Sequence, residues 1–192
     1  GFNATPPQGV NLKPHPEEDQ DQVLGIAADG QYYLNKQAIK NETLAERLKA
    51  VETFLAKLKP LRAEVVKLLM WEIGKTKGDA EKEFDRTVAY VRDTVRAVKE
   101  LDRRSSRFVI EEGVIGQIRR SPLGVVLCMG PYNYPLNETF AILIPALIMG
   151  NTMVFKPPQY GTLLFFPLLE AFQSAFPKGV INTVYGRGEV VV

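Results

Sequence analysis

The architecture of the chain shows most clearly in two stretches, Gly124-Val-Val-Leu-Cys-Met-Gly-Pro-Tyr-Asn-Tyr-Pro-Leu136 and Pro145-Ala-Leu-Ile-Met-Gly-Asn-Thr-Met-Val-Phe-Lys-Pro-Pro158. Each contains an apolar run without a polar break, Val125–Met129 in the first and Met153–Phe155 in the second. Strands buried on both faces, as in parallel sheets, have this composition, whereas half-exposed strands alternate between apolar and polar residues. We therefore expect two buried parallel strands.

Two polar residues, Asn133 and Lys156, follow these runs. Each stands where its strand is predicted to end, and one helix is predicted between the strands. Parallel strands joined in this way have their carboxyl ends at the same edge of the sheet, which is where open α/β sheets bind ligands. The sequence therefore predicts a ligand site that includes both residues.

The last third of the chain alternates strands with helices. It predicts a strand at 123–130, a helix at about 137–149, a strand at 151–156, a helix at about 162–175 and a strand at 180–185. Such alternation indicates an α/β fold, a Rossmann-like parallel sheet with right-handed connections and flanking helices. Residues 122–192 are expected to form the first βαβαβ half of a nucleotide-binding domain, which is incomplete by itself.

Residues 43–104 have a different pattern, in which apolar residues recur every three or four positions. This spacing is typical of amphipathic helices, and Gly74 and Gly78 are predicted to bracket a break between two of them. We expect two or three helices that pack on the sheet and belong to the same domain.

Two further segments are predicted to be β-structure. Residues 105–121 indicate a hairpin with its turn at Glu112-Gly113, and because a protruding hairpin tends to pair with another sheet edge, it is predicted to serve oligomerisation. Residues 1–42 are predicted to form a polar N-terminal arm and a strand-like segment around Asp29-Gly30.

The composition excludes several kinds of function. The 192 residues include 24 basic and 22 acidic side chains, so no surface suited to nucleic acid is expected. The one cysteine rules out an internal disulfide, and no metal site of Cys and His is predicted. The one histidine, His15, lies between two prolines and is expected to be an exposed loop residue. Such cysteine usage favours a reducing, cytoplasmic location.

The apolar segments and the ends of the chain complete this picture. The longest apolar run, Leu136–Met149, is interrupted by polar residues and Pro145 and is shorter than the roughly 20 apolar residues of a membrane span. The first residues lack the pattern of a signal peptide. Because the chain begins without Met and ends just after Gly186-Arg-Gly188, where a helix should begin, we expect it to be part of a longer protein.

A family resemblance is carried by four motifs, Gly130-Pro-Tyr-Asn-Tyr-Pro135, Pro145-Ala-Leu with Gly150-Asn151, Phe155-Lys-Pro-Pro158 and Asn182-Thr-Val-Tyr-Gly-Arg-Gly188. In order and spacing they resemble the cofactor-binding half of the aldehyde dehydrogenase superfamily. The Asn-Tyr-Pro form, the double proline and the Gly-Arg-Gly ending are most similar to the NADP-dependent non-phosphorylating glyceraldehyde-3-phosphate dehydrogenases. The resemblance covers residues 64–192.

The resemblance implies a catalytic role for Asn133. An aldehyde attacked by a thiolate becomes an oxyanion, and in this family the Asn amide donates to it. From the residues alone, Asn133 could instead cap the helix that follows Pro135. Arg86 and Tyr134 match positions that bind the substrate phosphate in the glyceraldehyde-3-phosphate subfamily. The alternatives for these two are a solvated helix arginine and a packing tyrosine.

The resemblance also implies an NADP site formed by Pro131, Tyr132, Lys156, Gln159, Gly186 and Gly188. Lys156 would hold the ribose hydroxyls and the 2′-phosphate. NAD-preferring relatives commonly have Glu where Gln159 stands, so the neutral side chain favours NADP, and the usual residue of the closest subfamily is Thr. Outside this context, Lys156 would be an ordinary strand-end lysine and the Gly-x-Gly sequence a plain turn.

Cys128 is not the predicted nucleophile. It lies inside an apolar run, where burial would raise the pKa of its thiol, so we expect a core residue. In the family, the nucleophilic cysteine and the carboxylate for deacylation lie further along, beyond Val192. Arg119 and Arg120 are predicted to be a solvated pair or an interface contact.

The resemblance therefore implies a fragment of an NADP-dependent aldehyde dehydrogenase that oxidises glyceraldehyde-3-phosphate to 3-phosphoglycerate through a thioester. The fragment itself is expected to be inactive. The intact protein is expected to bind a small aldehyde and to form a homotetramer or homodimer, without nucleic acid, membrane or metal. The alternatives are an enzyme for a different aldehyde, a non-catalytic nucleotide-binding or assembly module, and an RNA-binding protein, which a net charge of +2 does not favour.

Overall fold

A computed structural model describes three short strands before residue 40 and then residues 43–105, 109–116 and 120–186. The chain divides into two compact units, Gly1–Glu42 and Thr43–Val192. In the first unit an antiparallel sheet has the order β1 (Leu24–Ile26), β2 (Tyr32–Leu34), β3 (Gln37–Ile39). The predicted strand-like segment is therefore present, whereas the Asp29-Gly30 turn and His15 lie outside the described residues.

The second unit begins with helices, as the apolar spacing predicts. They are α1 (Leu44–Leu58), the 3₁₀ turn η1 (Lys59–Leu61), α2 (Arg62–Ile73) and α3 (Lys77–Ser105). Thr43 and Glu46 form a capping box at the start of α1, which satisfies amides that the helix cannot bond internally. Gly74 ends α2 with φ +68°, but Gly78 lies inside α3, so the predicted break is confirmed at Gly74 alone.

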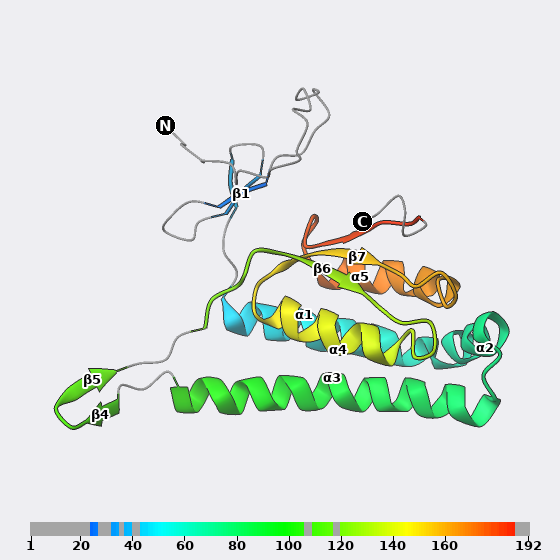
Figure 1. Ribbon diagram of the computed structural model, residues 1–192, viewed down its shortest axis with the longest axis horizontal. Coiled ribbons are helices and arrows are strands. Elements are labelled where there is room, and N and C mark those ends of the chain that lie inside the picture. The colour runs from blue at the N-terminus through cyan, green and yellow to red at the C-terminus, as the bar shows by residue number, and fades with distance from the viewer. Residues whose placement is uncertain are drawn as a thin grey trace. The chain divides into compact units, whose positions relative to one another are not determined.

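The parallel sheet follows the predicted order. It is formed by β6 (Val125–Met129), β7 (Thr152–Lys156) and β8 (Ile181–Thr183), joined first by α4 (Asn137–Ile148) and then by η2 (Leu163–Leu168) and α5 (Leu169–Ala175). The predicted helix at 162–175 begins as a 3₁₀ segment that contains Pro167, whose nitrogen cannot donate to a helical hydrogen bond. The fold is α/β, an incomplete Rossmann-like sheet with flanking helices (Figure 1).

The predicted hairpin is also present. Its strands are β4 (Val109–Glu111) and β5 (Val114–Gly116), paired in antiparallel register. Glu112 and Gly113 have φ of +51° and +83°, the left-handed conformation that a type I′ hairpin turn requires at both positions. Its role in oligomerisation stays a prediction.

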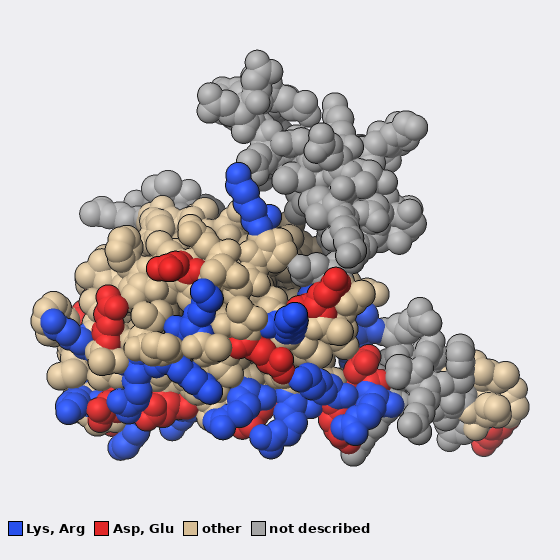
Figure 2. All heavy atoms as spheres, turned by 180° about the vertical axis from the view of Figure 1, so that it is seen from behind, with Lys and Arg blue, Asp and Glu red and all other residues tan. Residues whose placement is uncertain are grey.

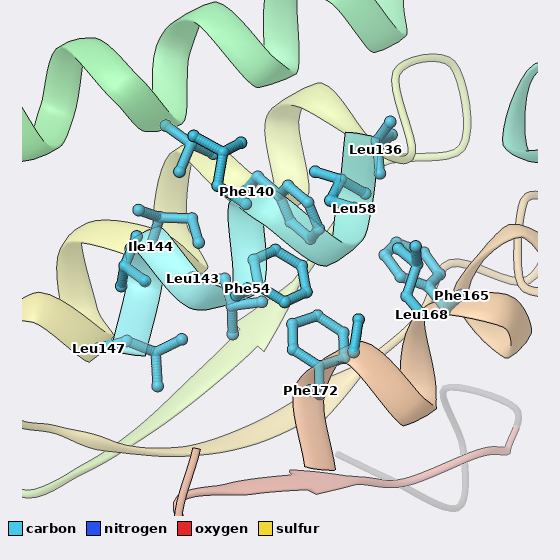
Figure 3. Close-up of a cluster of buried hydrophobic side chains, with 14 of the residues drawn as sticks. Phe54, Leu58, Leu136, Phe140, Leu143, Ile144, Leu147, Phe165, Leu168 and Phe172 are labelled. Atoms are coloured by element: carbon cyan, nitrogen blue, oxygen red, sulfur yellow. The ribbon is translucent and has the colours of Figure 1, made fainter. Parts of the chain in front are cut away.

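The core lies between the sheet and the helices, with three rings at its centre. Phe54 of α1 stacks on Phe172 of α5 with ring centroids 4.5 Å apart, and Phe140 of α4 meets Phe54 edge-on at 5.7 Å. Figure 3 shows Phe54 between the other two rings. In Figure 1, α4 and α1 lie between the sheet and α3. Offset and edge-on ring contacts add to the stabilisation that burial provides.

Hydrogen bonds of the Asn151 side chain connect α4 to the sheet. Its side-chain oxygen accepts from the backbone nitrogens of Leu123 (2.6 Å) and Gly124 (3.0 Å), and its amide nitrogen donates to the carbonyl of Ala146 (2.9 Å). One buried side chain therefore fixes the start of β6 against the end of α4, which gives the Gly150-Asn151 motif a structural role.

The prediction that the strands are buried on both faces is wrong for the described residues. Cys128 is fully buried, but Val125, Leu127 and Met129 on the other face of β6 are 53%, 48% and 47% exposed. The two connections run in the same direction, from β6 to β7 to β8. Right-handed connections that run in one direction place their helices on the same face, which agrees with the exposed second face of β6. Helices of the described residues therefore cover one face of the sheet.

The outer surface of α3 is charged with both signs. Figure 2 shows Lys and Arg mixed with Asp and Glu along the bottom of the view, where α3 runs. Arg62 of α2 donates to both oxygens of Asp85 at 2.8 and 2.9 Å, and this guanidinium holds the pKa of the Asp85 carboxyl below its usual value. None of the described helices is long and apolar enough to cross a membrane.

Candidate functional site

The two strands that carry the predicted site end side by side. The parallel register pairs Met129 of β6 with Lys156 of β7, so the loops that follow, residues 130–136 and 157–162, leave from the same edge. Gly161 (φ +92°) lies against Pro135, and a Cβ at Gly161 would be 2.6 Å from the Cβ of Pro135. We call residues 130–136 the first loop and residues 157–162 the second loop. The contact of Gly161 with Pro135 joins the two loops, and only glycine fits at position 161.

The first loop turns tightly into α4. A Cβ at Gly130 would lie 1.8 Å from the hydroxyl oxygen of Thr139, so no side chain fits there. The same hydroxyl donates to the carbonyl oxygen of Pro135. The first contact explains why glycine stands at position 130 of the Gly130-Pro-Tyr-Asn-Tyr-Pro135 motif, and the second joins the other end of the motif to α4.

A buried carboxylate from α3 caps α4. Glu83 is 2% exposed, and its Oε1 accepts from the backbone nitrogens of Leu136 (3.0 Å) and Asn137 (3.2 Å). Its Oε2 accepts from the ammonium of Lys75. The residue before α4, Leu136, provides no side-chain cap. Sequence reasoning did not single out Glu83 or Lys75, because a cap that comes from 53 residues away leaves no local signal.

Asn133 lies on the exposed part of the first loop. The alternative interpretation made it the cap of the following helix, but Glu83 bonds to those amides instead. Among the described residues, Asn133 has no hydrogen-bond partner for its side-chain amide. A free amide at the carboxyl edge of a parallel sheet is suited to donate to a ligand oxygen.

Tyr134 is partly exposed and contacts a cation. The ammonium of Lys75 lies 3.7 Å from the centroid of its ring, which is a favourable cation–π distance. Pro131 and Tyr132 are exposed beside it in the same loop. Lys75 therefore holds one face of the Tyr134 ring, and this ring carries the hydroxyl group.

Arg86 is exposed on α3, one turn beyond Glu83. Helices α3 and α4 run in the same direction, because Glu83 bonds to the start of α4 and the hydroxyl of Tyr90 donates to the carbonyl of Ala141 at 3.1 Å. Along α3, Arg86 therefore lies between the two residues that bond to the first part of α4, at the end where Tyr134 lies. The neighbouring carboxylate of Asp85 is bonded to Arg62.

The second loop carries Lys156 at its start. Within the described part of the chain, the ammonium of Lys156 donates to the carbonyl oxygen of Pro157 at 3.2 Å. An ammonium has three donors, so donors remain for a ligand. Pro157 and Pro158 are buried, and Gln159 is exposed. Lys156 therefore precedes a stiff double proline, and a neutral polar residue, Gln159, follows three positions later.

Glu72 of α2 has the role for the second loop that Glu83 has for the first. Its Oε2 accepts from the backbone nitrogens of Leu163 (2.7 Å) and Leu164 (3.3 Å) at the start of η2. This contact was also missed from the sequence, since 91 residues separate the partners.

The remaining candidates fall into three groups. Gly186 is exposed after β8, whereas Gly188 and Arg119 lie outside the described residues. Cys128 is buried, as predicted, and burial raises the pKa of its thiol to about 11, so almost no nucleophilic thiolate forms at neutral pH. The described residues contain no group of His, Cys, Asp and Glu side chains that could hold a metal ion.

Comparison with known proteins identifies the family. The profile described as "Aldehyde dehydrogenase family" matches residues 6–192. The NADP-dependent glyceraldehyde-3-phosphate dehydrogenase of Nicotiana plumbaginifolia is 31% identical over an alignment of 187 residues that covers 91% of this chain and 36% of the relative. The malonate-semialdehyde dehydrogenase 1 of Bacillus licheniformis is 34% identical over 146 residues, 76% of this chain and 30% of the relative.

A solved structure agrees with these matches. The NADP-dependent glyceraldehyde-3-phosphate dehydrogenase from Bacillus halodurans, complexed with NADP, superposes with a TM-score of 0.68 at 34% identity, over 78% of this chain and 33% of that one. The chain thus spans about a third of the length of the proteins it matches. With a family profile matched along almost its whole length and the fold shared with a solved relative, this chain belongs to the aldehyde dehydrogenase family.

Proposed function

We propose that the protein to which this chain belongs is an NADP-dependent, non-phosphorylating glyceraldehyde-3-phosphate dehydrogenase. The observation that carries the proposal is the pairing of β6 with β7, which sets the exposed amide of Asn133 and the ammonium of Lys156 at one sheet edge. Relatives named NADP-dependent glyceraldehyde-3-phosphate dehydrogenase, among them one solved in complex with NADP, support the choice.

Asn133 is the proposed oxyanion donor. When a thiolate attacks the aldehyde carbon, the carbonyl oxygen becomes an oxyanion, and an amide already in place stabilises it without reorganising during the reaction. The thiolate must come from outside residues 1–192, because the one cysteine of this chain is buried and holds its proton. Loss of hydride from the tetrahedral species gives a thioester, and water then releases 3-phosphoglycerate.

The residues at the second loop fit the adenosine end of NADP. When bound, the cofactor supplies the hydride acceptor. The Lys156 ammonium has donors to spare for the ribose hydroxyls and the 2′-phosphate, and Gln159 adds no negative charge that would repel that phosphate. Pro131, Tyr132, Gly186 and Gly188 are proposed as further cofactor contacts.

The substrate phosphate is assigned to Arg86 and Tyr134. A guanidinium donates two parallel hydrogen bonds to a phosphate, and a tyrosine hydroxyl adds a third donor. The parallel packing of α3 on α4 puts both residues at the same end of α4, which supports a shared ligand.

The test uses the full-length protein. NADPH formation from glyceraldehyde-3-phosphate is followed by absorbance, with and without inorganic phosphate, and with NAD in place of NADP. We expect turnover that does not need phosphate and prefers NADP, and no turnover from residues 1–192 alone. A requirement for phosphate, or turnover by residues 1–192, would contradict the proposal.

A second candidate is oxidation of an unphosphorylated aldehyde, which the similarity to a malonate-semialdehyde dehydrogenase favours. The same assay with malonate semialdehyde and glyceraldehyde distinguishes the two. The cytoplasmic location and an assembly through the 105–121 hairpin are also proposals, and the oligomeric state is tested by light scattering of the full-length protein.

A further inference from the structure

We propose that the buried Glu83 and its ion-pair partner Lys75 position the two neighbouring site residues Asn133 and Tyr134. Glu83 acts through the backbone at the start of α4, and Lys75 acts through the ring of Tyr134. Neither residue touches the substrate in this proposal; each is a positioning residue. The inference rests on the proposed function, because it assigns the pair a role in that same site.

The surroundings of Glu83 fit this role. Its side chain is completely buried, and burying a carboxylate is costly unless donors surround it. Three donors do: two amides of the first loop and α4, and the Lys75 ammonium. Since Glu83 lies within the 29-residue helix α3, the start of α4 is fixed to a long, rigid element.

Lys75 lies at a point that is fixed from both sides. Gly74 ends α2 in a left-handed conformation before it, and the Thr76 hydroxyl accepts from the Asp79 backbone nitrogen after it, at 3.2 Å. The side chain is 14% exposed and reaches both the Glu83 carboxylate and the Tyr134 ring. The Lys75 ammonium therefore links Glu83, the cap of α4, to the ring of Tyr134, whose hydroxyl is the proposed phosphate donor.

The geometry joins the pair to the rest of the site. Glu83 and Arg86 are three residues apart and so lie on neighbouring turns of one face of α3. A bond from Glu83 to the first loop therefore sets Asn133 and Tyr134 at a defined place relative to Arg86. A cap supplied from within α4 could satisfy the same amides but would not fix this relation.

The first arm of the test compares three variants of the full-length enzyme. Glu83→Ala removes the carboxylate, and Val91→Ala is the matched control, since it opens a cavity in the fully buried core of the same helix without touching the first loop. With Asn133 misplaced by about 1 Å, kcat for Glu83→Ala is expected to fall about 10- to 100-fold for glyceraldehyde-3-phosphate and glyceraldehyde alike. Val91→Ala should keep its kcat below its unfolding temperature.

The third variant separates the two residues of the pair. Glu83→Gln combined with Lys75→Gln keeps an oxygen for the two amides and an amide–amide hydrogen bond within the pair, but it removes the cation from the Tyr134 ring. Its kcat with glyceraldehyde should stay near that of the wild type, whereas KM for glyceraldehyde-3-phosphate should rise about 3- to 10-fold, as expected for a lost cation–π contact. This variant also keeps the test open if Glu83→Ala does not fold.

Hydrogen exchange of the peptide that contains residues 130–140 gives a readout independent of activity. It should become faster in Glu83→Ala and stay near the wild-type rate in Val91→Ala and in the double Gln variant. Equal kinetic losses in Glu83→Ala and Val91→Ala, or unchanged exchange and kcat in Glu83→Ala, would overturn the positioning role. A wild-type enzyme that oxidises neither aldehyde would overturn the proposed function instead, while the exchange data would still report whether Glu83 holds the loop.

Discussion

Two loops leave the sheet at its carboxyl edge, residues 130–136 after β6 and residues 157–162 after β7, and each runs into a helix whose first amides bond to a distant carboxylate. For the first loop that carboxylate is Glu83, which is buried and paired with a lysine. For the second it is Glu72, which is only partly buried. Both helices therefore begin with a carboxylate cap from a distant residue, which is buried at the first loop and partly buried at the second.

The difference between the loops corresponds to the work proposed for each. An oxyanion donor must stand in place before the reaction, because reorganising it would add to the barrier. A lysine that binds a phosphate has a flexible four-carbon stem and tolerates a less exact support. We infer that the first loop is fixed by a buried charge because it carries the chemistry, whereas the second carries cofactor selectivity.

The largest effect is expected at the exposed end of the first loop. Asn133→Ala in the full-length enzyme should lower kcat by about 10²–10³-fold, as for other single oxyanion donors. Both glyceraldehyde-3-phosphate and glyceraldehyde should be affected alike, since every aldehyde forms the oxyanion. Steady-state kinetics with the two substrates measure this. Normal kcat in a folded Asn133→Ala enzyme would remove the functional contrast between the loops.

A smaller and more selective effect is expected at Arg86. Arg86→Ala should lower kcat/KM for glyceraldehyde-3-phosphate tens-fold, which corresponds to about 2–3 kcal/mol for a charged hydrogen bond. Glyceraldehyde should be almost unaffected, because it has no phosphate. If the two aldehydes lose equally, or neither loses, Arg86 is a solvated helix residue and the substrate assignment fails.

The second loop should control the choice of cofactor. Lys156→Ala should weaken NADP binding relative to NAD by about 1–3 kcal/mol, the size of a lost charge-assisted contact. Gln159→Glu should penalise NADP further, through repulsion between the carboxylate and the 2′-phosphate. Titration of each cofactor against the full-length enzyme measures both effects. Equal losses for NAD and NADP would show that Lys156 does not distinguish them.

The sequence could predict those features of the loops that follow from neighbouring residues, but not those that depend on contacts between distant residues. The apolar runs predicted β6 and β7 and placed Asn133 and Lys156 at one edge, because strand composition and right-handed connections are local rules. The two carboxylate caps could not be predicted, since each joins residues more than 50 positions apart. The run Val125–Met129 indicates a strand covered on both faces, but among the described residues the second face of β6 is exposed.

The smallest effect is expected for Glu72, the cap of the second loop. It tests whether the different burial of Glu72 and Glu83 gives the two carboxylates different contributions to stability. Glu72→Ala leaves the amides of Leu163 and Leu164 to bond with water, because this cap is close to the surface, so it should cost about 1 kcal/mol of unfolding free energy. Glu83→Ala leaves two buried amides and the largely covered ammonium of Lys75 without their acceptor, for which about 3–5 kcal/mol is expected. Urea denaturation of the two full-length variants measures both values. Comparable losses would mean that the loops are held equally firmly, and the difference between them would then lie only in the side chains they present.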